Sequence, residues 1–173
     1  VLKKLVNLGV LGVGLIGKRH VEFILKSKIA NLVAIADPDS SAKSYASKLG
    51  VNYFNSLDQM LASSTLDGVV IATPNNLHVS NGLECIKHGI PSLIEKPLAS
   101  TAKDAEIIAQ ASEHSNVPVL VGHHRRYNPI IIAAKKIINS GTIGNVRSFH
   151  ANCWLYKPDE YFDGSIWRTK KGA

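Results

Sequence analysis

The feature that most constrains the fold is a glycine motif between an apolar run and an amphipathic segment. The apolar residues 6–11 lead directly into Gly12-Val13-Gly14-Leu15-Ile16-Gly17, after which the sequence has helical periodicity. In a strand–turn–helix unit, the first glycine makes the turn, the second lets the backbone approach a pyrophosphate, and the third allows close packing. Free N–H groups at the helix N-terminus also favour phosphate. The motif therefore predicts a dinucleotide-binding turn. Its expected contacts are Gly12, Gly14, Leu15, Ile16 and Gly17.

A carboxylate stands where such a turn requires one. Asp37 closes the apolar run 33–36, twenty positions after Gly17. An acidic side chain at the end of the second strand accepts hydrogen bonds from the ribose hydroxyls. The same charge repels a 2′-phosphate, and none of the three residues after Asp37 is an arginine. The sequence therefore predicts NAD as the cofactor, in preference to NADP. The other role open to Asp37 is a helix cap, which Asp39 or Ser40 already supplies.

Short apolar runs alternate with helix-period segments over the first 122 residues. The predicted strands are 6–11, 32–36, 51–54, 69–72, 92–95 and 117–121. The predicted helices are 15–28, 40–49, 57–62 capped by Ser56, 76–88, and a helix that Thr101 opens and that runs to residue 115. Nearly continuous Val, Ile and Leu are typical of parallel strands covered on both faces. We predict an α/β fold, a Rossmann-like doubly wound parallel sheet, as a dinucleotide-binding domain over residues 1–122.

The pattern changes after Gly122. Residues 123–129 are polar and predict a junction, Pro129 begins an apolar-faced helix to about Ser140, and alternation predicts a strand over 144–156. One helix and one strand cannot close a sheet. We therefore expect residues 123–173 to be the incomplete start of a second α/β domain; the alternative is that these elements pack on the first domain or on another chain. An unpaired strand edge invites pairing, so a homo-oligomer is expected through this strand.

Composition argues against several other classes of protein. Lys and Arg number 20 against 13 Asp and Glu, a net charge of +7, but the basic residues come as scattered pairs without an aromatic-rich stripe. This favours a solvated basic surface over nucleic-acid binding. No apolar run reaches the roughly 18 residues that span a membrane, and the expected location is the cytoplasm. Cys85 and Cys153 lack the spacing of a metal site and are predicted to be two buried free thiols.

Two further turns fall at the carboxyl ends of predicted strands, the edge at which parallel sheets bind ligands. Thr73-Pro74 interrupts the chain after the strand 69–72, and Glu95-Lys96-Pro97 follows the strand 92–95. Each turn is also compatible with an ordinary solvated loop. If the sheet forms as predicted, Lys96 projects beside the expected place of the nicotinamide ring.

Taken together, these residues resemble the Gfo/Idh/MocA oxidoreductases. The similarity rests on GVGLIGKRH, Asp37, VIATPNNLHV, IEKPLA and Trp167-Arg168, and it runs along essentially the whole sequence. Members of that family have an N-terminal Rossmann domain and a C-terminal α/β domain whose open sheet commonly mediates oligomers. The resemblance implies oxidation of a secondary or anomeric hydroxyl of a sugar, cyclitol or polyol, or the reverse reaction.

The resemblance also implies roles for individual residues. Lys96 would be catalytic, because its ammonium would hydrogen-bond the reacting oxygen and favour its alkoxide. In such proteins the bond that corresponds to Lys96–Pro97 is often cis. Arg125 and Arg126 would lie near the substrate. The implied lining of the cofactor site beyond the glycine turn and Asp37 is Thr73, Pro74, Asn76, His78, Glu95, Lys96, His123, Trp167 and Arg168.

The sequence departs from the family pattern at its last residues. The glycine-rich segment that follows Trp-Arg in relatives would begin near Lys171, and we expect the general base beyond residue 173. Three interpretations stay open. The chain is mainly the cofactor-binding part of an NAD-dependent dehydrogenase, or a non-catalytic NAD-binding or regulatory homologue. The third is an NAD-dependent glycosidase in which a transient oxidation precedes elimination.

Overall fold

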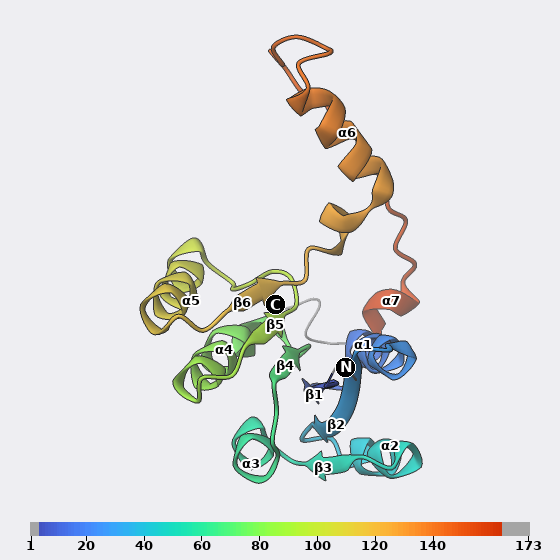
Figure 1. Cartoon of the computed structure of the whole chain (residues 1–173). Helices are drawn as coiled ribbons and strands as arrows, with labels where there is room; N and C mark the ends of the chain where they lie inside the picture. Colours follow the sequence, from blue (N-terminus) through green and yellow to red (C-terminus); the bar gives the residue numbers. More distant parts are fainter. Residues whose placement is uncertain (1–3, 164–173) are drawn as a thin grey trace. The chain divides into compact units, whose positions relative to one another are not determined.

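A single parallel sheet organises the first part of the chain in the computed structural model, which describes residues 4–163. Its strands are β1 (Val6–Leu11), β2 (Ala30–Ala36), β3 (Asn52–Phe54), β4 (Gly68–Ile71), β5 (Ser92–Ile94) and β6 (Val119–Val121). Their order is β3-β2-β1-β4-β5-β6, and every pair is parallel (Figure 1). Strand order reverses beside β1, as in a doubly wound Rossmann sheet. The predicted fold class is confirmed.

Helices cover both faces of this sheet (Figure 1). One face carries α1 (Leu15–Lys26) and α2 (Ser41–Leu49), and the other carries α3 (Leu57–Ser63), α4 (His78–Lys87) and α5 (Ala102–Ser115). The helix predicted from residue 76 begins instead as a 3₁₀ turn, η1 (Asn75–Leu77), and α4 follows it. The glycine turn therefore joins the central strand β1 to a helix of the first face.

Two apolar cores hold the sheet between these helix layers. Successive side chains of a strand point to opposite faces, so Val10 and Val70 enter the core under α1 and α2. Their neighbours Leu11 and Ile71 enter the other core. Burying an isoleucine such as the fully buried Ile71 contributes about 1.5–3 kcal/mol. Packing on both faces of the sheet fixes the positions of the strand ends relative to one another.

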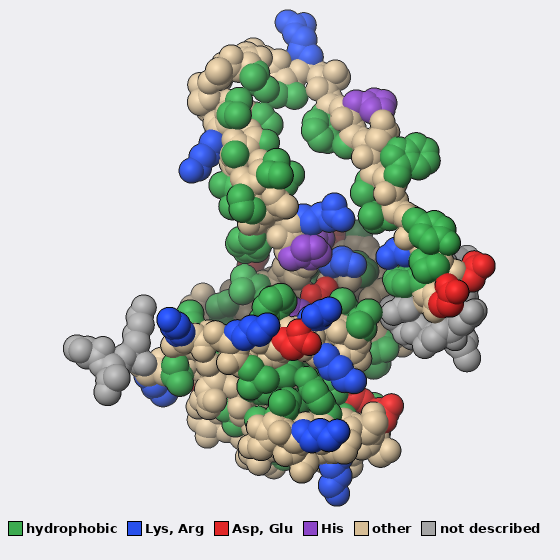
Figure 2. All heavy atoms as spheres, turned by 90° about the vertical axis from the view of Figure 1, so that its right-hand side faces the viewer, with side chains coloured by type: hydrophobic (Ala, Val, Ile, Leu, Met, Phe, Trp, Pro, Cys, Tyr) green, Lys and Arg blue, Asp and Glu red, His purple; other side chains and the backbone are tan. Residues whose placement is uncertain are grey.

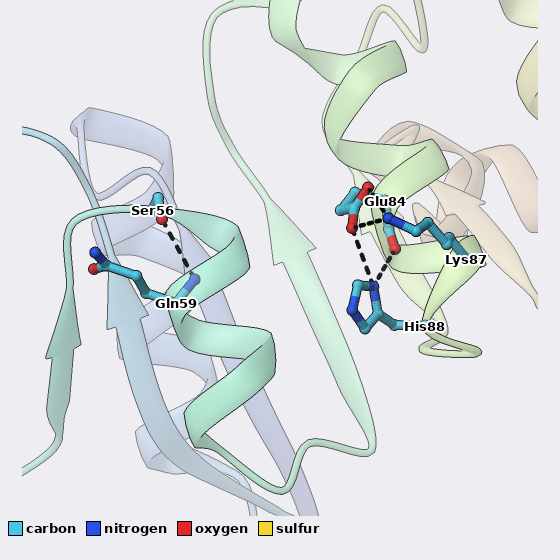
Figure 3. A network of polar contacts seen from close by, with 5 residues as sticks. All are labelled: Ser56, Gln59, Glu84, Lys87 and His88. Carbon is cyan, nitrogen blue, oxygen red and sulfur yellow. Dashed lines mark hydrogen bonds and ion pairs between the residues drawn. The ribbon is translucent and has the colours of Figure 1, made fainter.

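Polar side chains close several helix ends. The Ser56 hydroxyl accepts a hydrogen bond from the Gln59 N–H at 3.4 Å, which caps α3 as predicted (Figure 3). In the last turn of α4, Lys87 Nζ lies 3.0 Å from Glu84 Oε1, and His88 Nδ1 lies 3.0 Å from the Glu84 carbonyl oxygen (Figure 3). The contacts of Ser56 and His88 involve backbone groups near helix ends, whereas the contact between Lys87 and Glu84 joins two side chains.

The chain divides into two compact units between Gly122 and His123. The described part of the second unit contains η2 (His124–Tyr127), α6 (Pro129–Asn139) and α7 (Glu160–Asp163). The strand predicted over 144–156 is wrong, because this segment has no strand structure. A strand needs a neighbour to satisfy its backbone groups, and no described segment pairs with this one. Self-association through this segment stays a prediction.

Two smaller findings bear on the composition argument. Cys85 is buried, as predicted, whereas Cys153 is exposed, so the prediction of two buried thiols is wrong for the second. Cys153 lies in a segment that no described element covers. Within residues 4–163, no helix combines the length and the apolar character needed to cross a bilayer.

Candidate functional site

Five strand ends lie in register along one edge of the sheet. Leu11 is paired with Ala36 and with Ile71, Ile71 with Ile94, and Ile94 with Val121. The residues that leave the sheet at this edge include five residues of the predicted site. They are Gly12, Asp37, Thr73, Glu95 and Lys96, and Gly122 follows β6 at the same edge. The tertiary structure thus collects side chains from loops up to about a hundred residues apart in sequence at one edge.

The three glycines of the turn have three different physical reasons to be glycine. Gly12 has a φ of +83°, and a Cβ there would lie 2.8 Å from the carbonyl oxygen of Ala72. A Cβ on Gly17 would overlap the carbonyl oxygen of Gly12. A Cβ on Gly14 would have no atom within 4 Å, so the backbone there faces open space. A tight turn, an open approach and a close packing contact are what a pyrophosphate-binding turn needs.

The N-terminus of α1 lies directly after this open glycine. Gly14 is the N-cap and has no side chain to cap the helix, and the first turn contains no acidic residue. The first N–H groups of a helix have no partner within it, and the helix dipole makes this end partly positive. Leu15 and Ile16 are 67% and 47% exposed in this first turn. The turn and the helix end together fit the diphosphate of a dinucleotide.

Asp37 connects the end of β2 to the glycine turn. Its Oδ2 accepts a hydrogen bond from the Val13 N–H at 2.8 Å, and its Oδ1 accepts one from the Asp39 N–H at 2.8 Å. A carboxylate has about four acceptor positions, so each oxygen can still accept a bond from a ribose hydroxyl. The bond from Val13, which sequence reasoning did not anticipate, fixes the carboxylate beside the turn.

A cavity of about 210 Å³ opens beside Asp37. It is lined by Val13, Gly14, Lys18, Asp37, Asp39, Ser41, Ala42 and Tyr45. The N–H and hydroxyl of Ser41, helped by the charge of Lys18, hold the pKa of Asp39 below its usual value. The cavity lining therefore contains two carboxylates, Asp37 and Asp39, and one lysine, Lys18. This balance favours neutral ribose hydroxyls over a 2′-phosphate.

Glu95 forms a second polar centre at the end of β5. Its Oε1 lies 2.8 Å from His20 Nε2 of α1, and its Oε2 accepts a hydrogen bond from the Lys96 N–H at 3.2 Å. The two side chains of the pair are only 22% and 17% exposed. A Cβ on Gly122 would lie 2.9 Å from Glu95 Oε1, so a side chain at this position would require the carboxylate to shift. Glu95 therefore links α1 to the loop of Lys96.

His20 is a site residue that sequence reasoning missed. It is three positions after Gly17 on α1, and its partner Glu95 is 75 residues further along the chain. The only signal in the sequence is the helical spacing, which places a histidine one turn after the last glycine. That spacing alone could not show which residue it would meet.

Lys96 itself is exposed at the same edge, and the Lys96–Pro97 peptide bond is cis. The cis bond agrees with what the family resemblance implied.

His78 is placed differently from the expectation. It has no exposed surface, and its ring nitrogens lie 2.8 Å from the Pro97 carbonyl oxygen and 2.9 Å from the Thr73 carbonyl oxygen. A side chain without exposed surface cannot touch a ligand in this arrangement. We therefore correct its direct contact with the cofactor to an indirect role, in which it holds together the two loops that follow β4 and β5.

The remaining predicted residues are found in several settings. Thr73 is half-buried, with Oγ1 3.4 Å from Asn81 Nδ2, whereas Pro74 and Asn76 are exposed. His123, Arg125 and Arg126 are exposed in the second unit. Trp167 and Arg168 lie outside the described residues. Contact of these residues with a cofactor or substrate stays a prediction.

Comparison with known proteins now decides the family. Residues 6–123 match the model of Gfo/Idh/MocA proteins, described as an oxidoreductase family with an NAD-binding Rossmann fold. The chain belongs to the Gfo/Idh/MocA family. Among the relatives of this Gfo/Idh/MocA chain, an inositol 2-dehydrogenase of Rubrobacter xylanophilus is 36% identical over 153 residues, covering 85% of the chain and 44% of that enzyme.

Solved structures of proteins with bound ligands are also similar to this chain. The WlbA dehydrogenase from Bordetella pertussis, in complex with NADH and UDP-GlcNAcA, has a TM-score of 0.89 and 30% identity, covering 95% of this chain and 51% of that one. The scyllo-inositol dehydrogenase from Lactobacillus casei, with bound NAD(H) and scyllo-inositol, has a TM-score of 0.77 and 28% identity. The match covers 82% of this chain and 43% of that dehydrogenase. The Gfo/Idh/MocA chain thus spans about half the length of these proteins or less, and the shared part includes the NAD-binding fold.

Proposed function

We propose that the protein is an NAD-dependent dehydrogenase that acts on a hydroxyl group of a sugar, cyclitol or polyol, and that this chain is mainly its cofactor-binding part. One observation carries the proposal. Lys96 follows β5 at the edge where the glycine turn follows β1, and the strands between them are paired in register. A cation at this position suits the reacting end of a dinucleotide whose diphosphate occupies the turn. The inositol dehydrogenases among the relatives support the substrate class.

The chain's own residues would hold the cofactor in three places. Gly12, Gly14 and the N-terminus of α1 would bind the diphosphate, and Asp37 would accept hydrogen bonds from the adenosine ribose. Thr73, Pro74, Asn76, Glu95, His123, Trp167 and Arg168 are the proposed lining of the groove. When bound, NAD supplies the hydride acceptor.

Lys96 would act on the substrate oxygen. Its ammonium would donate a hydrogen bond to the hydroxyl oxygen and stabilise the negative charge that develops there as the proton leaves. Glu95 would keep the loop in place, because it accepts from the Lys96 N–H and pairs with His20. The general base that takes the proton is expected beyond residue 173.

The test is substitution of Lys96 in the intact protein. Lys96→Ala is expected to lower turnover by about 10²–10³-fold, as for the loss of one donor to a developing oxyanion, while the Kd for NADH changes by only a few-fold. Lys103→Ala removes an exposed lysine of α5 and is the matched control. Unchanged turnover in Lys96→Ala would reject the role. NADH binding without turnover of any polyol or sugar would favour the non-catalytic homologue instead.

A further inference from the structure

The positive charge of the chain is concentrated in its second unit. Residues 1–122 carry 11 Lys and Arg against 10 Asp and Glu, a net of +1, whereas residues 123–173 carry 9 against 3, a net of +6. Between Glu113 and Asp159 there is no acidic residue at all, but there are six Lys and Arg. Three of the five adjacent pairs of basic residues lie in this second, much shorter unit. A field of one sign attracts ligands of the opposite sign.

Two of the eleven Lys and Arg of the first unit have a described carboxylate partner, whereas the described contact of a cation in the acid-free segment is that of Lys157 Nζ with the ring of Tyr161, at 4.2 Å from its centroid. Arg19 lies 3.0 Å from Glu22, and Lys87 lies 3.0 Å from Glu84. Among residues 123–158, no Lys or Arg forms an ion pair within the described structure. Figure 2 shows such blue side chains, with histidines in purple, open to solvent on the face that it draws.

An open cavity of about 530 Å³ lies over η2 and the start of α6, and it presents part of this charge. Its lining is His124, Arg125, Tyr127, Asn128, Ile130 and Ile131. The Asn128 Oδ1 accepts a hydrogen bond from the Ile130 N–H at 2.9 Å, which leaves its NH₂ group to donate elsewhere. Tyr127 is 75% exposed. The cavity thus combines hydrogen-bond donors with an aromatic ring and two apolar side chains, without a carboxylate.

We propose that the substrate of this dehydrogenase is an anionic sugar, one that carries a carboxylate or a phosphate, and that Arg125 binds the anionic group with the help of His124 and Asn128. The proposal rests on the proposed function and names its substrate class. A guanidinium presents two parallel N–H groups that match a carboxylate or phosphate. Tyr127, Ile130 and Ile131 would contact the carbon skeleton of the sugar.

The experiment compares three ligands that share one ring. Glucose, glucuronate and glucose 6-phosphate are titrated into the intact protein by calorimetry, with and without NADH. We expect glucuronate, glucose 6-phosphate or both to bind at least about tenfold more tightly than glucose, the size expected for a charge-assisted pair. Tighter binding of glucuronate would indicate a carboxylate site, and tighter binding of glucose 6-phosphate would indicate a phosphate site.

Two matched variants test whether Arg125 is responsible for the preference for anionic sugars. Arg125→Gln is expected to remove the preference for the anion, whereas Lys135→Gln, which removes an exposed charge of α6, leaves it within about twofold. Equal binding of all three sugars, or an equal loss in both variants, would overturn the proposal. Tighter binding of a duplex DNA that displaces the sugar anions would overturn it as well.

A separate titration with NADH keeps the two proposals apart. Intact NADH binding with no preference for anionic sugars refutes only the substrate class. Absence of NADH binding refutes the proposed function itself.

Discussion

Several isoleucine side chains are completely buried in the first unit of the chain, whereas those described in the second unit are exposed. In the first unit, Ile71, Ile94 and Ile108 are completely buried. In the second, Ile131 and Ile137 of α6 are 51% and 50% exposed, and every residue from 123 to 160 is exposed. Buried side chains are held by many contacts, whereas exposed ones are not. This difference shows that apolar residues hold a binding site in place only where their side chains are packed.

The positions of the site residues follow from this difference. In the first unit, Asp37 and Glu95 each bond to groups that the packed sheet already places. In the second unit, Arg125 and Arg126 stand on a short 3₁₀ turn without described ion-pair partners. Four experiments would break or sharpen the comparison.

The largest effect is the loss of NADH binding expected from a change at Gly17. A Cβ there would overlap the Gly12 carbonyl oxygen, so Gly17→Ala must displace the turn, and we expect NADH binding to be lost together with about 1–3 kcal/mol of stability. Gly14→Ala meets no atom within 4 Å; it should keep the stability within about 1 kcal/mol but weaken NADH binding. Denaturant unfolding and NADH fluorescence measure the two effects. Tight NADH binding by Gly17→Ala would show that the turn is not the cofactor site.

The second prediction compares the change in the free energy of unfolding when each of two isoleucines is replaced by alanine. Ile108→Ala removes a completely buried side chain and should cost about 2–5 kcal/mol in the free energy of unfolding. Ile131→Ala changes a half-exposed side chain of α6 and should cost less than about 0.5 kcal/mol. Urea titrations of the two variants measure both values. A similar cost at the two positions would mean that the face of α6 is covered in solution, and the contrast between the units would disappear.

A smaller effect is expected at the His20–Glu95 pair. His20→Leu leaves a largely buried carboxylate without its partner, which should cost about 1–3 kcal/mol. His20→Gln keeps a donor and should recover part of this loss. Arg19→Gln breaks a pair whose side chains are 65% and 47% exposed, so it should change stability by less than about 1 kcal/mol. Thermal unfolding ranks the three variants, and the pair has no structural role if His20→Leu matches Arg19→Gln.

The smallest effect concerns the two thiols. Burial, with the nearby charge of Glu84, raises the pKa of Cys85 to about 12. Since the thiolate is the reactive form, Cys85 should resist iodoacetamide at pH 8 while the exposed Cys153 is alkylated. Because the unfolded chain releases this proton near pH 9, the contribution of the neutral thiol to stability is present below pH 9 and is lost as the pH rises toward 12. Peptide mass spectrometry measures the labelling; rapid labelling of Cys85 would show that its core opens.

Much of the first unit could be predicted because its signals are local. The glycine turn, the acidic end of β2 and the Ser56 cap each depend on residues close in sequence, and the structure has a turn, a strand end and a cap at these places. Apolar strands between helix signals also predicted a parallel sheet. The same approach failed over residues 144–156, where an alternating pattern does not form a strand in the absence of a described partner.

Contacts between distant segments were decided by the tertiary structure. The pairing of His20 with Glu95 depends on which strands are neighbours in the sheet, and so does the bond from Val13 to Asp37. His78 was expected at the groove but is buried between two loops, because burial depends on the segments packed around a residue rather than on its neighbours in the chain. Backbone preference and charge are properties of short stretches and can be inferred from the printed residues. Register, burial and the partner of each charge arise only when separate stretches meet.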